Sequence, residues 1–477
     1  MYPGVPYTGR ERTTSDMSAL REQETCQRSH NVRMPLVPAT AWRLVTGVLT
    51  TALVAAGCAS PPEEADDASA SLPPILFVHG NGDSSALWIT TIWRFESNGY
   101  PRDRLFAVDL IAPTARDDDA VAQANRSSTG DVRDQLSARV DEILKSTKSA
   151  MVALVANSRG ANTVRNYLKN GGGAAKVGWV VLGGGVNHGV YSIPGGPNSE
   201  FNGAAAFMKQ LNDGAEVIPG VKYLTIRSDR LDKYAQPELS PGRMSGISYD
   251  GPALRGATNV VLEGIDHRET AFSARAFVET YRFLTGKTGK TDIAPEDRPR
   301  LTGYVGGCEN RAPTNRGVAG VTVTIYEVDG STGARTGGAV LTTTTGQDGS
   351  WGTLSAKPDK SYEFVVEAAS QAVRHFFRSP FPRSSDHVSL RLLEDAPATS
   401  GKGLIIFTRP RGYIADGRDE HSLDGRPVPG VAPGIPTSSS FRIETTQFGR
   451  AIPASLNGET VVVRAFPGEI VYAEFHH

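Results

Sequence analysis

A serine lies where the hydrophobic pattern of the sequence changes from strand-like to helical. A continuous apolar run of the strand type, Val152–Val155, is followed by residues 161–168, in which apolar side chains recur at helical spacing. Ser158 lies between them, two residues after Ala156 and two before Gly160. A serine in such a strand–turn–helix bend faces out of the sheet, next to backbone N–H groups that can bind an oxyanion. A small-x-Ser-x-Gly string also occurs by chance, so the strand-to-helix context carries the prediction that Ser158 is a nucleophile.

A serine hydroxyl reacts well only when a base removes its proton, and the base needs a carboxylate that fixes its tautomer. His267 follows the last apolar run, 260–262, and precedes the final helical pattern, so it is placed to reach the bend. Asp229 and Asp232 both follow the apolar run at 223–226. The two aspartates compete for the role of the acid.

Backbone donors must stabilise the oxyanion that such a nucleophile creates. The N–H of Arg159 is the first expected donor, because Arg159 directly follows Ser158. The second is the N–H of Asn81, in the glycine-containing loop 79–85 that follows the first apolar run. We expect His79 to brace this loop by hydrogen bonds.

Several further residues surround the candidate site. Asp266 is adjacent to His267 and cannot easily face it edge-on, so we assign it to a loop hydrogen bond. We expect His188, Tyr191 and Trp88 to line the substrate pocket, with a loop-fixing role as the alternative for His188 and core packing as the alternative for Trp88. Tyr191 belongs to the long segment 186–220, which can wall a pocket, form a movable lid or pack against the sheet. We expect the remaining histidines at the surface: His375, His387, His421, His476 and His477.

Length and composition narrow the class of protein. With 477 residues, 39% of them hydrophobic and 21% charged, the chain can bury more than one core, and we expect two or three domains. A net charge of −1 with scattered Lys and Arg excludes nucleic acid as a partner. Three cysteines without paired spacing exclude a disulfide framework and a zinc site.

The N-terminal part has the pattern of an export signal. Arg43 precedes the apolar stretch 44–57, which is too short to cross a bilayer and closes with small residues before Cys58. This is similar to a bacterial lipoprotein signal, whose cysteine is lipidated after cleavage, although Ala55 stands where leucine is preferred. We therefore expect export and a lipid anchor at Cys58 in the periplasm or outer membrane, with plain secretion as the alternative.

Strand-like and helical patterns alternate through the middle of the chain. Apolar runs lie at 75–78, 105–108, 152–155, 177–182, 223–226 and 260–262, and helical patterns at 87–98, 132–144, 161–168, 204–211 and 271–284. Continuous apolar runs are typical of parallel strands covered on both faces. Because such strands are joined by right-handed crossovers, the alternation predicts an α/β fold with a mostly parallel sheet and helices on both faces, over residues 72–287.

The helical period disappears after a polar linker at 288–300. Segments 321–326 and 362–366 alternate as half-buried strands do, which predicts an antiparallel β-sandwich at 301–396. This segment resembles the small prealbumin-like modules appended to many secreted enzymes. Further strand patterns at 401–477 either complete this sandwich or form a second module.

The expected organisation begins before the folded parts. Residues 1–58 form an N-terminal extension and signal peptide, and translation from Met34 in place of Met1 is an alternative because the first 33 residues are polar and patternless. Residues 59–71 combine prolines and acidic residues with small residues, a composition typical of a flexible tether.

Five motifs together resemble the bacterial lipase and esterase branch of the α/β-hydrolases. They are Val78–Gly82, Leu105–Asp109, Ala156–Gly160, Asp232–Pro237 and Asp266–His267, all within residues 72–287. Ala156 departs from the usual glycine of the serine motif. Asp232, with Gln-Pro after it, resembles the acid loop of serine lipases, so we favour it over Asp229, which we interpret as a turn cap.

The resemblance implies hydrolysis of carboxylic esters through an acyl-enzyme, with Ser158, His267 and Asp232 as the triad and without a metal cofactor. The family also includes amidases, thioesterases and polyester-degrading enzymes. An exported protein with an apolar pocket suits lipid or polyester substrates. The competing hypothesis is a surface binding protein that uses the β modules and has an inactive hydrolase domain.

Overall fold

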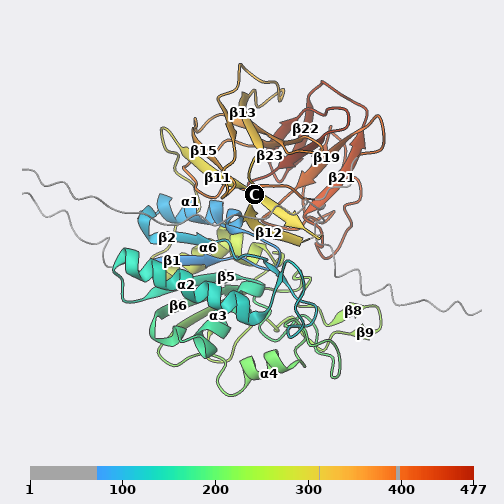
Figure 1. Cartoon of the computed structure of the whole chain (residues 1–477). Coiled ribbons are helices and arrows are strands. Elements are labelled where there is room, and N and C mark those ends of the chain that lie inside the picture. Colours follow the sequence, from blue (N-terminus) through green and yellow to red (C-terminus); the bar gives the residue numbers. More distant parts are fainter. Residues whose placement is uncertain (1–71, 311, 394–397) are drawn as a thin grey trace, which may run out of the picture.

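The structure is a computed structural model that describes residues 72–310, 312–393 and 398–477. It has two lobes, an α/β domain and a β region (Figure 1). Cys58, the export signal and the tether lie outside the described residues. Among the helices of the described ranges, none combines the length and the apolar character that a membrane span requires.

A six-stranded parallel sheet forms the centre of the α/β domain. Its strands are β1 (Ile75–Val78), β2 (Leu105–Val108), β5 (Val152–Asn157), β6 (Val177–Gly183), β7 (Lys222–Ser228) and β10 (Thr258–Leu262), in the order β2-β1-β5-β6-β7-β10. Each strand coincides with one of the six apolar runs. The predicted α/β class is confirmed, because buried strands and intervening helices alternate as the sequence indicated.

Helices cover both faces of this sheet (Figure 1). One face packs against α1 (Ile89–Ser97) and α6 (Ala274–Thr285), and the other against α2 (Thr129–Thr147) and α3 (Arg159–Asn170). The shorter helices are η3 (Ser85–Trp88), η4 (Arg102–Arg104), η5 (Gly173–Ala175), α4 (Ala206–Asn212) and α5 (Glu269–Phe272). Two short strand pairs, β3 (Thr114–Ala115) with β4 (Arg126–Ser127) and β8 (Glu238–Ser240) with β9 (Arg243–Met244), lie in the connecting loops.

The β region contains fourteen strands among the described residues. They are β11 (Arg300–Glu309), β12 (Ala312–Gly317), β13 (Thr322–Val328), β14 (Leu341–Thr344), β15 (Ser350–Ser355), β16 (Ser361–Glu367), β17 (Arg374–Arg378), β18 (Leu390–Arg391), β19 (Gly403–Thr408), β20 (His421–Leu423), β21 (Ser440–Thr445), β22 (Ile452–Leu456), β23 (Glu459–Val463) and β24 (Ile470–Glu474). Three sheets result, with strand orders β12-β11-β15, β14-β13-β16-β17-β24-β19-β21 and β20-β22-β23, and β18 pairs with β11 beside the first.

The seven-stranded sheet joins the two halves of the β region. Strand β24 inserts between β17 and β19 and runs parallel to both. Residues 301–396 and 401–477 therefore contribute to one sheet and do not form two separate sandwiches. Strands β14, β13, β16 and β17 of 301–396 pair antiparallel, as expected. Strand β24 is parallel to its neighbours because it returns to the middle of the sheet over a long connection.

Helix α1 belongs to two cores at once. Phe95 packs into the core of the α/β domain, whereas Ile89 and Trp93 pack into the core of the β region. The indole nitrogen of Trp93 donates a hydrogen bond to the carbonyl oxygen of Ser384 at 2.9 Å. The two lobes thus share buried apolar surface, and burial of this surface from water stabilises both.

At least two of the expected surface histidines have buried side chains in the β region, His375 and His421, whose side chain is 4% exposed. The side chain of His375, on β17, lies between the carboxylates of Glu363 at 2.7 Å and Glu469 at 2.6 Å, and the residue is only 3% exposed. The surface assignment of His375 is therefore wrong. The position of His375 on a central strand explains this outcome, because its side chain points toward Glu363 on β16 and Glu469 directly before β24.

The bend between β5 and α3 packs directly against the end of β1. Ser158, at the bend, has a positive φ of 55°, which is uncommon for a residue with a side chain. A Cβ atom on Gly160 would lie 2.7 Å from the carbonyl oxygen of His79 and 2.8 Å from that of Val78. These obstacles are backbone atoms, so glycine is required where helix α3 passes β1.

We expect Gly160→Ala to lower the free energy of unfolding by about 1–3 kcal/mol, because the added methyl group overpacks a rigid contact. Thermal or urea unfolding measures this change. Gly130→Ala is the matched control: its Cβ would meet only the Ser128 hydroxyl, at 3.6 Å, near the start of α2. Stability equal to the wild type in both variants would contradict the packing argument.

Candidate active site

The carboxyl ends of four strands bring the candidate residues to one edge of the sheet. Val78 of β1 is level with Ala156 of β5, and Ser228 of β7 is level with Leu262 of β10. The loops after these strands carry Asn81, Ser158, Asp232 and His267. Ligands of open α/β sheets bind outside this edge.

The predicted base and acid are in direct contact. The imidazole Nδ1 of His267 lies 2.9 Å from the carboxylate of Asp232, and both residues are nearly inaccessible, at 2% and 3% exposure. The carboxylate also accepts a hydrogen bond from the backbone N–H of Tyr234 at 2.8 Å, and the Tyr234 ring stands edge-on to the imidazole, with the two ring centroids 4.6 Å apart. An ionised carboxylate here holds the proton on Nδ1 and leaves Nε2 as the acceptor.

The loop of His267 is tied to the serine bend. Asn157, the residue before Ser158, donates from its side-chain amide to the carbonyl oxygens of Gly183 at 3.0 Å and His267 at 3.5 Å. The Nε2 atom of His267 is buried and has no hydrogen-bond partner among the described residues. A buried imidazole nitrogen without a partner is unusual in a structural histidine, which favours a role in proton transfer.

The competing aspartate has a different task. Asp229 accepts a hydrogen bond from the backbone N–H of Gly264 at 3.1 Å, and its carboxylate also lies 3.1 Å from the hydroxyl oxygen of Ser228. It therefore links the ends of two neighbouring strands. Asp266 is fully buried and accepts hydrogen bonds from the backbone N–H groups of Arg268 and Glu269, and burial raises its pKa to about 6.

The loop after β1 is held in place by two side chains. His79 is buried; its Nδ1 donates to the carbonyl oxygen of Gly80 at 2.8 Å, and its Nε2 accepts from the backbone N–H of Leu110 at 3.1 Å. The side-chain oxygen of Asn81 accepts from the backbone N–H of Ala115 at 2.7 Å. These bonds place the backbone of Asn81 near the start of α3, and its role as an oxyanion donor stays a prediction.

Arg159 supplies more than the expected backbone donor. Its guanidinium, 2% exposed, donates to Glu200 at 2.6 Å, to the carbonyl oxygen of Pro113 at 2.8 Å and to that of Ser127 at 2.9 Å. It therefore fixes two loops beside Ser158. Sequence reasoning missed Glu200, because a lone charge in a long loop is normally solvated and no nearby residue marks its partner.

The three predicted pocket residues lie in different surroundings. Trp88 is fully buried, and its ring packs between those of Phe77 and Phe272, which favours the core alternative. Tyr191 is half-buried, and its carbonyl oxygen accepts from the backbone N–H of Gly203 at 2.6 Å.

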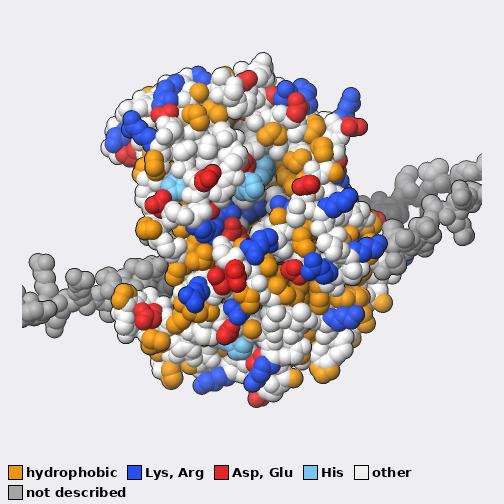
Figure 2. Space-filling model, turned by 180° about the vertical axis from the view of Figure 1, so that it is seen from behind, with side chains coloured by type: hydrophobic (Ala, Val, Ile, Leu, Met, Phe, Trp, Pro, Cys, Tyr) orange, Lys and Arg blue, Asp and Glu red, His pale blue; other side chains and the backbone are white. Residues whose placement is uncertain are grey.

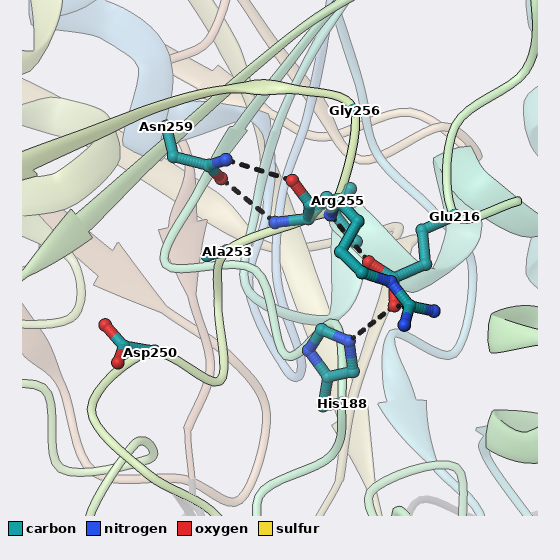
Figure 3. A pocket seen from close by; sticks show the side chains of 8 residues that line it. His188, Glu216, Asp250, Ala253, Arg255, Gly256 and Asn259 are labelled. Atoms are coloured by element: carbon teal, nitrogen blue, oxygen red, sulfur yellow. Dashed lines mark hydrogen bonds and ion pairs between the residues drawn. The ribbon is translucent and has the colours of Figure 1, made fainter.

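His188 lines an open pocket of about 450 Å³ with Glu216, Asp250 and Arg255 (Figure 3). Its Nε2 lies 3.2 Å from the Glu216 carboxylate, which also binds the guanidinium of Arg255 at 2.9 Å. Ser158, Asp232 and His267 do not line this pocket.

The ring of His79 gives a pH-dependent contribution to stability. Burial lowers its pKa below the ordinary value of 6.5. The folded state therefore keeps the ring neutral, while the unfolded chain takes up a proton as the pH falls through 6.5, so this part of the stability is lost in acid.

We expect the free energy of unfolding of the wild type, relative to His79→Gln, to fall between about pH 7 and pH 5. Glutamine keeps an acceptor for the N–H of Leu110 but does not titrate. Urea unfolding at several pH values measures the difference. A difference that is constant with pH would contradict the assignment of His79 as a neutral brace.

Comparisons with known proteins found matches within both lobes. The sequence model described as lipase (class 2) matches residues 73–229, and the model described as lipase C-terminal domain matches residues 300–395. A search of curated proteins returned no match.

Solved structures similar to this chain include the Bacillus licheniformis lipase BlEst2 in its propeptide form, at 16% identity over 84% of this chain and 98% of that chain, with a TM-score of 0.34. The mature form of that lipase matches at 23% identity over 44% and 90%, with a TM-score of 0.31. Aspergillus fumigatus lipase B matches at 16% identity over 48% of this chain and 56% of its own, with a TM-score of 0.34.

The two family matches cover both lobes, and the first spans the serine bend and the loop after β1. Together with the parallel sheet, they show an α/β-hydrolase fold with a lipase (class 2) domain, which supports a carboxylic ester hydrolase.

Proposed function

We propose that the chain is an exported serine hydrolase that cleaves carboxylic esters through Ser158, His267 and Asp232. The observation that carries the proposal is the buried hydrogen bond between His267 and Asp232, which leaves Nε2 of His267 without a partner among the described residues. Asn157, next to the strained Ser158, donates to the carbonyl oxygen of His267. An imidazole that is hydrogen-bonded through one nitrogen, and whose second nitrogen lacks a partner, can accept a proton at the second nitrogen.

In this mechanism, Nε2 of His267 removes the proton of the Ser158 hydroxyl as the serine oxygen attacks the ester carbonyl. The carboxylate of Asp232 stabilises the imidazolium that forms, and this stabilisation is strong because both groups are excluded from water. His267 then protonates the departing alcohol. The acyl-enzyme is hydrolysed when the same imidazole activates a water molecule.

The developing oxyanion is assigned to two backbone N–H groups. Arg159 is the first residue of α3, so its N–H lies at the positive end of the helix and directly after the nucleophile. The N–H of Asn81 is the proposed second donor. The bonds of His79 and Asn81 described above fix this loop before substrate binds, so no energy is needed to order it during reaction.

The substrate class is proposed from context. Lipid esters fit the match to a lipase family, and aliphatic polyesters present the same bond. The export signal predicted around Cys58 would deliver the protein to such substrates outside the cytoplasm, either anchored by a lipid or secreted. An amidase or thioesterase would use the same three residues, and a binding protein with an inactive site would not need them.

We expect Ser158→Ala to lose hydrolysis of a chromogenic short-chain ester, and labelling by a fluorophosphonate, while it unfolds at an unchanged temperature. The reason is that only this hydroxyl lies at the nucleophile bend. Ser389→Ala, which removes a buried hydroxyl of the β region, is the matched control and should retain both activities. Activity of Ser158→Ala at the wild-type rate would refute the proposal.

Wild-type rates on soluble esters, emulsified triglyceride, polyester film, an anilide and a thioester then rank the substrate classes. If the anilide or the thioester is hydrolysed faster than every oxygen ester, the cleaved bond is an amide or a thioester and not a carboxylic ester. Absence of hydrolysis on the whole panel, together with absence of fluorophosphonate labelling, would favour the binding protein.

The two candidate acids can be separated by isosteric substitutions. We expect Asp232→Asn to lower kcat by about 10⁴-fold, because the amide cannot fix the productive tautomer of His267. Asp229→Asn should lower kcat far less, since Asp229 bonds to Ser228 and Gly264. Steady-state kinetics of the two variants, measured side by side, decides the assignment; an inactive Asp229→Asn beside an active Asp232→Asn would reverse it.

A further inference from the structure

The β region forms hydrogen bonds with the loop that carries His267, on both sides of the histidine. Asp266 accepts a hydrogen bond from the backbone N–H of Tyr413 at 2.7 Å. Arg268 donates to the carbonyl oxygen of Pro410. The two residues flanking the proposed base are therefore both bonded to the β region.

Buried charges reinforce this contact. Glu269 binds the guanidinium of Arg409 at 2.6 Å and that of Arg418 at 3.1 Å. The same two arginines approach the Asp266 carboxylate at 3.7 and 3.4 Å, and they bind Asp419 of the β region at 3.6 and 3.0 Å. We call these five residues, Asp266, Glu269, Arg409, Arg418 and Asp419, the ionic clasp.

The clasp is shielded from solvent. Exposure of its side chains runs from 0% for Asp266 to 17% for Arg418. A buried carboxylate that loses its cationic partner is strongly destabilised, so the loop and the arginines must stay together. Surface ion pairs would not impose such a constraint.

The acid loop contacts the same segment of the β region. Lys233, next to Asp232, donates to the carbonyl oxygen of Thr437 at 2.5 Å, and its ammonium lies 4.1 Å from the centroid of the Tyr413 ring. Tyr413 is buried and interacts with Tyr234, whose ring stands edge-on to His267. One segment of the β region, 409–419, thus contacts the loops of both the proposed base and the proposed acid.

Charged side chains gather along the narrow waist between the two lobes (Figure 2). A second buried ion pair at this interface lies away from His267. Arg383 of the β region binds Glu96 of α1 and Glu296 of the linker, each at 2.9 Å, and its side chain is 15% exposed. It is comparable to Arg409 in burial and charge, but its partners belong neither to the loop of the base nor to that of the acid.

We propose that Arg409 and Arg418 are positioning residues for ester hydrolysis, through which the β region sets the place of the His267 imidazole. The inference rests on the proposed function, because it assumes that His267 is the base. Proton transfer depends steeply on the geometry of donor and acceptor. An enzyme whose His267 loop has lost its contacts with the β region should therefore turn over slowly even when substrate still binds.

The test compares full-length Arg409→Met with full-length Arg383→Met, measuring kcat, KM, the rate of fluorophosphonate labelling and the unfolding temperature. Both variants lose a buried interface ion pair, so both should unfold at a lower temperature. We expect Arg409→Met to lower kcat and the labelling rate at least tenfold, with KM within about threefold of the wild type. Arg383→Met should keep kcat within about twofold.

Glu269→Gln serves as a milder variant, since it keeps an acceptor but removes the charge that Arg409 and Arg418 bind. We expect it to lower kcat with little change in KM, even where Arg409→Met does not fold. The inference is overturned if Glu269→Gln has the same kcat as the wild type. It is also overturned if Arg409→Met and Arg383→Met lose kcat equally, or if kcat rises when the clasp is removed. Ser158→Ala, assayed in parallel, separates this failure from failure of the proposed function, because an active Ser158→Ala refutes the mechanism itself.

Discussion

The hydrogen bond between His267 and Asp232 is the interaction on which the arrangement of the site depends. It joins the loops after β7 and β10, two strands that are neighbours in the sheet, and both partners are excluded from water. Such a bond persists only where the surrounding structure holds both loops, because each group would otherwise be better solvated outside. Much of the remaining structure can be understood as support for these two loops.

That support comes from both lobes. Within the α/β domain, Asn157 reaches from the serine bend to the carbonyl oxygen of His267, and Ser228 donates to that of Ile265 at 2.6 Å. From the β region, Asn315 donates to the carbonyl oxygen of Asp83 at 2.8 Å, on the loop that carries the proposed oxyanion donor. The β region therefore contacts the loop after β1 as well as the base and acid loops, which an appended module with a separate task would not need to do.

The sequence predicted well what depends on periodicity and local crowding. The six strands and the sharp bend at Ser158 follow from apolar runs and local crowding. The edge at which parallel strands end left Asp229 and Asp232 both open as partners of His267, and only the resemblance to serine lipases favoured Asp232, the residue that contacts His267 in the structure. What it could not predict depends on contacts between residues far apart in the chain. The sequence pattern around Arg409 predicts only a strand of the β region. No local pattern indicates that the partner of Arg409 is Glu269, 140 residues earlier. Likewise, the sequence of α1 shows only an ordinary amphipathic pattern, which does not indicate that the helix packs against both the α/β domain and the β region.

The chemistry of arginine explains how such distant contacts can hold a loop. Its planar guanidinium has several donors in fixed directions, so one side chain can bind two or three acceptors at once. Arg159 does this beside the proposed nucleophile, and Arg409 and Arg418 do it beside the proposed base. A hydrophobic contact at the same places would bury as much surface but would tolerate sliding of the loops, since it has no directional preference. Directional, buried charge therefore provides the restraint that a three-residue catalytic geometry requires.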